Sequence, residues 1–160
     1  MEEAGGKYIK LNVGASFVAD EGSGATAAVL RDEKGRFIAA QCKFIQFAAD
    51  VVTTEAMAMR DGLNLANTLG FNRVEAESDS LSVVNCCQGQ NQWWDAGAAV
   101  FAKCIDTATS VGKVIFSYCF REENLVAHEL AKFSFCNKYD RSWSDEPRVL
   151  NQPPCERCNN

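Results

Sequence analysis

The chain has 160 residues, of which 47% are hydrophobic and 23% are charged. This composition predicts one globular domain with a hydrophobic core and argues against a disordered chain. The net charge of −5 and the isoelectric point near 4.9 argue against a general nucleic-acid-binding protein, which needs a basic surface.

Three strands are predicted in the first third of the chain. Residues 8–17 alternate between hydrophobic and polar side chains, the period of a strand with one buried face. Turn-forming residues at 20–24 precede a second strand at 25–31. A second turn at 32–35 precedes a third strand at 36–47. Short turns between consecutive strands predict an antiparallel meander.

A helical period follows the third strand. Thr53, Thr54 and Glu55 are predicted to open a helix, with a hydroxyl N-cap and an acid in the first turn. Gly70 is predicted to end this helix in the left-handed conformation. Gly62 lies in the middle of the helix and is predicted to mark a close approach of another backbone.

The stretch FNRVEAESDSLSVVNCC, residues 71–87, joins a strand to a helix. Side chains alternate up to Ser78, and hydrophobic residues recur at helical spacing after Asp79. A carboxylate at the C-terminal end of a strand lies where open α/β sheets place their functional sites. Asp79 is also among the most typical helix N-cap residues, which suits the helix dipole, and on this stretch alone capping is the commoner of the two interpretations. Both interpretations stay open on this stretch alone.

Two more helices and one more strand complete the domain. They are predicted at 96–111, 113–120 and 124–137, with the strand in the middle. The element order is therefore βββαβααβα. A meander followed by strands that are reached through helices predicts an α/β fold, with a five-stranded mixed sheet flanked by helices.

The polar loop at 88–95 carries Trp93 and Trp94. These rings are candidates for stacking on nucleobases or for binding a partner protein. No basic residue follows the loop before Lys103, so nucleic-acid binding lacks the usual cations. The commoner alternative is packing at the root of the next helix.

One domain is expected at 8–137, after a short N-terminal extension at 1–7. Residues 138–160 are polar and contain all three prolines, so we expect a poorly ordered tail. Several of the eight cysteines lie at hydrophobic positions, which indicates buried free thiols in a reducing compartment. Cys155 and Cys158 form a lone CxxC, whereas a zinc site needs two more ligands.

The compartment is expected to be intracellular, cytoplasmic or nuclear. The first residues, MEEAGGK, do not resemble a secretory or transit peptide. Hydrophobic runs in the sequence are too short to span a membrane, so no membrane partner is expected.

The element order and four motifs resemble the ribonuclease H fold, and most of all its plant reverse-transcriptase-like branch, whose domains are similar to type 1 ribonuclease H. The matching stretches, which lie within residues 8–137, are KLNVGASF, GSGATAAVLRDEKGRFIAA, TTEAMAMRDGLNLANTLGFNRVEAESDS and REENLVAHELAK. The resemblance implies four acidic side chains around two Mg²⁺ ions. Such ions, held about 4 Å apart, activate a water molecule and stabilise the leaving oxygen of a phosphodiester cleavage.

Only two of these four acids are present. Glu55 matches the acid of the first helix, and Asp79 matches the acid after the fourth strand. Gly14 stands where the family pattern NVDxxF has its acid, and His128 stands where NxxADxLAK has its acid. A histidine expected shortly before the last helix is Tyr118. Glycine offers no ligand, and imidazole suits zinc or a softer metal better than Mg²⁺.

We therefore expect a degenerate site in which Glu55 and Asp79 hold at most one weak Mg²⁺ or Mn²⁺ ion, or no metal. Both acids also suit a helix start, and a lone histidine such as His128 is more often a partly exposed helix residue than a ligand.

Two functions stay open. The first is a ribonuclease H-like domain without two-metal nuclease activity, which binds a protein partner or, weakly, nucleic acid. The second is an active or residual ribonuclease H that cleaves the RNA strand of RNA/DNA hybrids with a divalent metal. The missing ligands and the acidic net charge favour the first.

Overall fold

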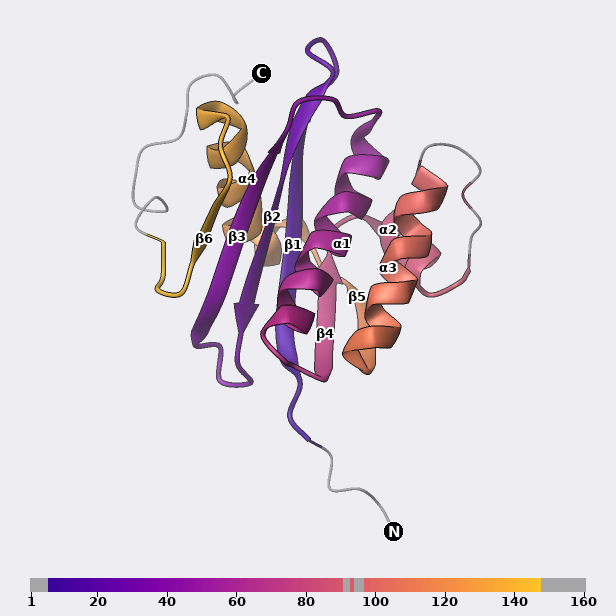
Figure 1. Cartoon of the computed structure of the whole chain (residues 1–160), viewed down its shortest axis with the longest axis vertical. Coiled ribbons are helices and arrows are strands. Elements are labelled where there is room, and N and C mark those ends of the chain that lie inside the picture. The colour runs from indigo at the N-terminus through magenta and orange to yellow at the C-terminus, as the bar shows by residue number, and fades with distance from the viewer. Residues whose placement is uncertain (1–5, 91–92, 94–96, 148–160) are drawn as a thin grey trace.

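The computed structural model describes residues 6–90, 93 and 97–147. Its strands are β1 (Ile9–Val18), β2 (Ser23–Arg31), β3 (Phe37–Ile45), β4 (Arg73–Ser78), β5 (Lys113–Tyr118) and β6 (Arg141–Trp143). Its α-helices are α1 (Val51–Thr68), α2 (Leu81–Cys87), α3 (Gly97–Val111) and α4 (Leu125–Asn137), and the 3-10 helix η1 (Arg121–Asn124) leads into α4. Figure 1 shows these elements around one twisted sheet.

The strands form a mixed sheet in the order β5-β4-β1-β2-β3-β6. The strands β1, β2 and β3 pair antiparallel, which confirms the predicted meander, whereas β4 pairs parallel to both β1 and β5. The predicted mixed α/β sheet is therefore confirmed, and β1 and β2 are its two central strands.

The predicted number of five strands is wrong, because β6 adds a sixth. It lies inside residues 138–160, the segment predicted to be a poorly ordered tail. It pairs antiparallel with β3, with Ala40 opposite Trp143. Three residues are too few to show the alternating pattern of a strand, so β6 has no periodic signal in the sequence. The rest of the tail from residue 148 onward, which includes Cys155 and Cys158, lies outside the described residues.

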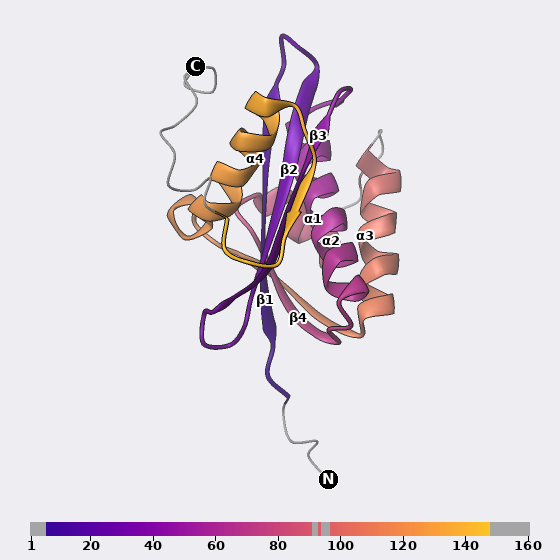
Figure 2. The same cartoon turned by 60° about the vertical axis from the view of Figure 1, so that its left-hand side comes forward.

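Helices cover both faces of the sheet (Figure 2). The helix α4 packs on β1, β2 and β3 from one side, and α1 packs on β1 and β2 from the other. The helices α2 and α3 lie on the same side as α1, next to β4 and β5. The larger hydrophobic cluster fills the space under α1, and a smaller cluster lies under α4. No helix in the described part of the chain combines the length and hydrophobicity that a membrane span requires.

The helix α1 begins earlier than predicted. Its N-cap is Asp50, whose Oδ1 accepts a hydrogen bond of 2.7 Å from the backbone N–H of Thr53, so the predicted hydroxyl cap is wrong. Gly70 adopts the expected left-handed conformation, with a φ of 82°. Gly62 is tightly packed, but the predicted approach of another backbone is wrong: a Cβ there would meet side chains, at 2.7 Å from Cγ1 of Val13 and 2.9 Å from Cδ1 of Leu11 on β1.

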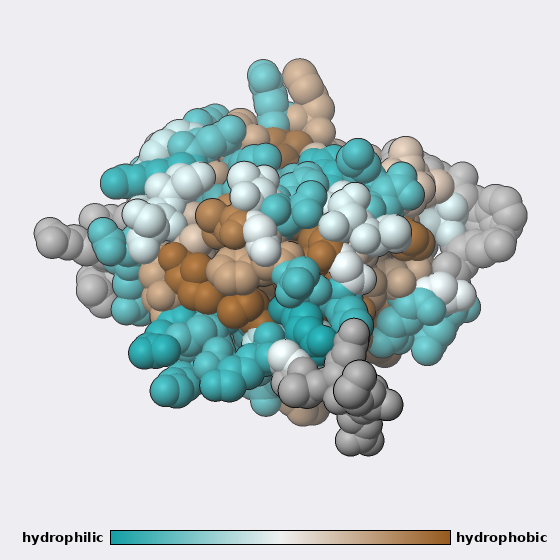
Figure 3. Space-filling view, turned by 60° about the horizontal axis from the view of Figure 1, so that its bottom comes forward, coloured by the Kyte–Doolittle hydropathy of each residue, from teal (hydrophilic) through white to brown (hydrophobic). Residues whose placement is uncertain are grey.

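The surface mixes polar and hydrophobic side chains. In Figure 3, which brings the lower end of the molecule forward, hydrophobic residues gather on the side of β3 and hydrophilic residues surround them. Half-buried hydrophobic side chains that pack on the smaller cluster are Phe37, Val126, Phe133 and Trp143. The six cysteines of the described residues are free thiols, and five of them are buried, as the sequence predicts.

Candidate functional site

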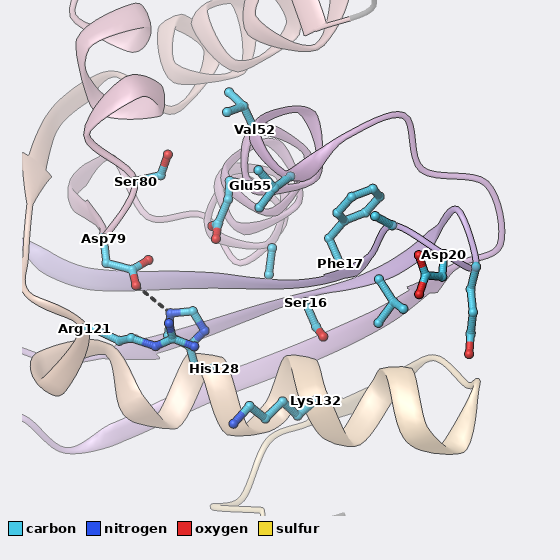
Figure 4. A pocket seen from close by; sticks show the side chains of 15 residues that line it. Ser16, Phe17, Asp20, Val52, Glu55, Asp79, Ser80, Arg121, His128 and Lys132 are labelled. Carbon is cyan, nitrogen blue, oxygen red and sulfur yellow. Dashed lines mark hydrogen bonds and ion pairs between the residues drawn. The ribbon is translucent and has the colours of Figure 1, made fainter. Parts of the chain in front are cut away.

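A cleft of about 850 Å³ opens at the carboxyl ends of β1 and β4, between α1 and α4 (Figure 4). Ser16 and the turn after β1 form one wall, and α1 contributes Val52 and Glu55. Asp79 enters from the end of β4, and α4 contributes His128. The site residues predicted from the first helix, the fourth strand and the last helix therefore meet in one cleft.

Glu55 lies at the bottom of this cleft in a nearly buried position, with 8% of the residue exposed. Its Oε2 atom has no hydrogen-bond partner among the described residues. Burial and the negative charge of Asp79 raise the pKa of Glu55 to about 8, although Arg121 opposes this shift. Glu55 is therefore mainly protonated at neutral pH.

Asp79 has the opposite behaviour because His128 holds it. The Oδ2 atom of Asp79 and Nε2 of His128 lie 2.6 Å apart, and the two side chains are only 12% and 8% exposed. Burial favours the neutral form of Asp79, but the hydrogen bond and the charge of His128 outweigh burial and lower the pKa of Asp79. The second oxygen, Oδ1, is buried without a hydrogen-bond partner in the described part of the chain.

Asp79 is not the N-cap of α2. That position belongs to Ser80, whose Oγ accepts a hydrogen bond of 3.5 Å from the backbone N–H of Val83. The capping interpretation of Asp79 is therefore wrong, and its carboxylate is directed into the cleft instead (Figure 4).

His128 is buried, so its interpretation as a partly exposed helix residue is wrong. The burial of His128 could have been predicted from the residues that share its face of the helix. Ala131 and Ser134 follow His128 at intervals of three residues and are fully buried, which is typical of a helix face packed closely on a sheet. Its bond to Asp79 spans 49 positions of the chain and has no signature in a single sequence.

Gly14 lies where β1 and α4 approach most closely. A Cβ at this position would lie 3.0 Å from the carbonyl carbon of Ala127 and 3.0 Å from the backbone nitrogen of His128. Such contacts are tighter than ordinary van der Waals packing, so any side chain at position 14 requires α4 to move.

The neighbours of Gly14 on β1 do not replace a missing carboxylate. The side chain of Asn12 donates hydrogen bonds to Glu77 and to Asn124, at 3.0 and 3.2 Å. Asn124 in turn donates to the carbonyl of Val13 at 2.7 Å. Ser16 lines the cleft and offers only a neutral hydroxyl.

The resemblance to ribonuclease H implies a pair of Mg²⁺ ions in this cleft, and the donors present do not fit a pair. Mg²⁺ requires several oxygen ligands, and the cleft offers the free carboxylate oxygens of Glu55 and Asp79. The other oxygen of Asp79 is taken by His128. Within residues 6–90, 93 and 97–147, no three His, Cys, Asp or Glu side chains are arranged to hold a metal ion.

Arg121 and Lys132 also line the cleft, and the sequence did not single them out. For Lys132 a signal was available, because it follows His128 by four residues on one helix and so shares its face. Arg121 belongs to the short helix η1, which shows no usable period.

Trp93 of the predicted polar loop does not line the cleft. The ring of Trp93 is half-buried and packs against Phe101, with centroids 5.8 Å apart, at the root of α3. A Cβ at Gly97 would lie 2.6 Å from this ring, so the helix begins directly beneath it. Packing is therefore the observed role of Trp93, whereas Trp94 lies outside the described residues. Tyr118 ends β5 half-exposed, with its ring against the edge of Phe120.

A mixed sheet with β1 and β2 at its centre, helices on both faces and a cleft at the carboxyl ends of β1 and β4 define a ribonuclease H-like domain. The model of the reverse transcriptase-like family matches residues 12–134, and the chain belongs to this family. No curated protein matches the chain.

Solved structures share this fold at low sequence identity. RNase H1 from the halophilic archaeon Halobacterium salinarum NRC-1 superposes with a TM-score of 0.75 at 20% identity, over 82% of this chain and 98% of that chain. LC11-RNase H1, isolated from compost by a metagenomic approach, gives 0.76 at 22% identity, over 82% and 98%. The same enzyme in complex with an RNA/DNA hybrid gives 0.72 at 22% identity, over 81% and 97%. Likeness at this level of identity concerns the fold alone.

Proposed function

We propose that this protein is a ribonuclease H-like domain without two-metal nuclease activity, and that it acts as a binding module for a protein partner or, weakly, for nucleic acid. The observation that carries the proposal is Gly14. It stands where the family places an acid between both metals, and its backbone packs so closely on α4 that a side chain does not fit without movement.

The pair formed by His128 and Asp79 supports the same proposal. An acid that is hydrogen-bonded at 2.6 Å to a buried histidine has one oxygen fewer for a metal ion. Glu55, with a pKa of about 8, is mainly neutral at pH 7 and is a poor ligand in that form. The remaining site is expected to hold at most one weak Mg²⁺ or Mn²⁺ ion.

A protein partner is favoured over nucleic acid by charge. The relative LC11-RNase H1 has been solved with an RNA/DNA hybrid. This chain carries a net charge of −5, and its cleft places Asp20, Glu21 and Asp79 near any bound phosphate. Without metal ions these carboxylates repel a polyanion, so binding to a hybrid is expected to be weak.

The test is an incubation of the full chain with a labelled RNA/DNA hybrid, in Mg²⁺ and separately in Mn²⁺. We expect no cleavage above the buffer control. Cleavage that disappears in both Glu55→Gln and Asp79→Asn would overturn the proposal, because these substitutions remove the acids and keep the side-chain volumes.

A residual hydrolase with one metal ion is the second candidate. The free oxygens of Glu55 and Asp79 favour it, since both are buried and without a hydrogen-bond partner among the described residues. Titration with Mn²⁺, followed by the electron paramagnetic resonance of the free ion, separates the candidates. Saturation with two ions per chain supports a working enzyme, whereas one weakly bound ion or none agrees with a binding module.

A further inference from the structure

We propose that the cleft takes a lysine or arginine side chain that a protein partner inserts beside Glu55 and Asp79. This inference rests on the proposed function, because it assigns a ligand to a cleft that no pair of metal ions fills. The inference adds the chemistry of the partner: a basic segment of polypeptide whose lysine or arginine side chain has a long aliphatic stem that ends in a positive charge.

The first argument is the state of the two acids. Glu55 is 92% buried, since only 8% of it is exposed, and its Oε2 has no hydrogen-bond partner among the described residues. The Oδ1 atom of Asp79 is likewise buried and has no hydrogen-bond partner among the described residues. Figure 4 shows both carboxyl groups directed into the cleft. Buried acceptors without partners destabilise a fold, and both of these are satisfied together by a ligand that carries several N–H donors.

The second argument concerns the type of donor. An ammonium group offers three N–H donors and a guanidinium group offers five, and both bring the positive charge that a carboxylate favours. An anionic ligand presents acceptors and negative charge to the ionised Asp79, whereas a cation favours loss of the proton from Glu55, which then accepts as a carboxylate. The unsatisfied atoms of the cleft therefore select a cation.

The third argument is the shape and polarity of the cleft. Its volume of about 850 Å³ is far larger than an ion needs. Phe17, Val51 and Val52 line it, and Val51 is 53% exposed. Such walls suit the aliphatic stem of lysine or arginine, which packs on hydrophobic surface while its charged end reaches the acids.

The charges at the rim are mixed and give the proposal a test with a definite sign. Asp20 and Glu21 attract a cationic ligand, whereas Arg121 and Lys132 repel it. Arg121 is exposed, and its positive charge acts on both Glu55 and Asp79. Removing the charge of Arg121 is therefore expected to strengthen a basic ligand and to weaken an anionic one.

The experiment is a titration of the isotope-labelled full chain, followed by its amide resonances. The probe is acetyl-Gly-Lys-Gly-amide, and the matched control is the norleucine peptide, which keeps the stem and lacks the charge. We expect saturable shifts at Ser16, Glu55, Asp79 and Ser80 with the lysine peptide, and smaller shifts or none with the norleucine peptide.

Variants fix the position and the sign of the effect. Glu55→Gln is expected to weaken the lysine peptide roughly tenfold, since an amide cannot lose a proton to form the charged hydrogen bond that the bound cation favours. Arg121→Gln is expected to strengthen it about twofold or more, because one repulsive charge leaves the rim. Glu75 is a half-exposed acid on β4 away from the cleft, so Glu75→Gln makes the same carboxyl-to-amide change elsewhere and is the control that leaves the affinity unchanged.

Several results overturn the proposal. One is equal binding of the norleucine peptide, and another is the absence of cleft shifts with lysine and with the arginine analogue. Spermidine binding as tightly as the peptide shows a site for free cations and removes the protein partner. A hybrid oligonucleotide that shifts the same residues and loses affinity in Arg121→Gln shows that nucleic acid takes the cleft. Failure of the proposed function is seen separately, as hybrid cleavage, which no peptide experiment reports.

Discussion

Glu55 and Asp79 are neighbours in one cleft with opposite electrostatic states. Burial and the charge of Asp79 hold the proton on Glu55, whereas His128 holds the negative charge on Asp79. The two acids thereby avoid the repulsion of two buried anions, which in a metal site is offset by cations. His128 from α4 therefore supplies part of the charge compensation that a metal ion provides for such acids.

The state of Glu55 predicts an unusual dependence of stability on pH. Its pKa in the folded chain is about 8, above the ordinary value of 4.5 for a glutamate, so the folded state binds the proton more tightly than the unfolded state. The stabilisation from this proton is complete below about pH 4.5 and is lost as the pH rises through about 8. Glu55→Gln lacks this loss, so it is expected to be more stable than the natural chain at high pH, by up to about 5 kcal/mol.

Urea unfolding of both chains near pH 5 and near pH 9 measures this difference. Glu75→Gln is the control, because it removes a half-exposed carboxyl group outside the cleft. Parallel stability curves for the natural chain and Glu55→Gln contradict the prediction.

His128→Ala tests the bond between His128 and Asp79. It leaves a buried carboxylate without its hydrogen-bond partner, so it is expected to lower the free energy of unfolding at pH 7 by about 1–3 kcal/mol. Glu129→Ala changes the adjacent, exposed residue of the same helix and controls for helix propensity. A double-mutant cycle with Asp79→Ala is expected to give a coupling of about 0.5–3 kcal/mol. A coupling near zero means that the 2.6 Å contact contributes no stability.

The start of α1 shows how a helix end is misassigned from sequence. Asp50 precedes two valines, which are typical of strands, so the hydroxyl groups of the following threonines looked like the better cap. Asp50→Ala is expected to cost about 1 kcal/mol of stability, and Asp50→Asn, which keeps an acceptor, only a few tenths. The Oγ1 atom of Thr53 has no hydrogen-bond partner among the described residues, so Thr53→Val is expected to cost less than Asp50→Ala. Thermal unfolding compares the stabilities of the three variants. A larger loss of stability in Thr53→Val than in Asp50→Ala means that Thr53, and not Asp50, caps the helix.

The contact of β1 with α4 at Gly14 limits any attempt to restore an acid. Gly14→Ala adds only the Cβ that meets Ala127 and His128 at 3.0 Å, and it is expected to cost about 1–3 kcal/mol because α4 must shift. Gly14→Asp adds a carboxylate to the same clash and is expected to cost at least as much. Unfolding by urea gives both values, and Gly35→Ala is unsuitable as a control because its φ of 80° adds strain of its own. A fully stable Gly14→Ala shows that α4 yields easily, and then an acid at this position is structurally acceptable.

The parts of this fold that were predictable are those with local periods. The strands β1, β2 and β4 and the helix α3 lie within two residues of their predicted positions, because each has a continuous pattern of buried side chains. Glu55 and Asp79 were found from motifs, and the cleft does bring them together. The strand β6, the Asp50 cap and the bond of His128 to Asp79 depend on partners distant in sequence or on very short segments. No period in a single sequence carries that information.

The net charge of the whole molecule determines how strongly it binds nucleic acid and how this affinity depends on salt. The net charge is −5, and among the described residues the basic side chains that line the cleft, besides His128, are Arg121 and Lys132. Each phosphate that a cation neutralises adds about −0.9 to the slope of log affinity against log salt, so two cations give a slope near −2.

We expect a hybrid oligonucleotide to bind weakly, with a slope no steeper than this value, in fluorescence anisotropy measured over a range of salt concentrations. Arg121→Gln is then expected to bring the slope about one unit closer to zero, while Lys138→Gln, exposed beyond the end of α4, leaves it unchanged. A slope near −5 or steeper requires a basic surface outside the cleft, and it would make nucleic acid, in place of a protein, the principal partner.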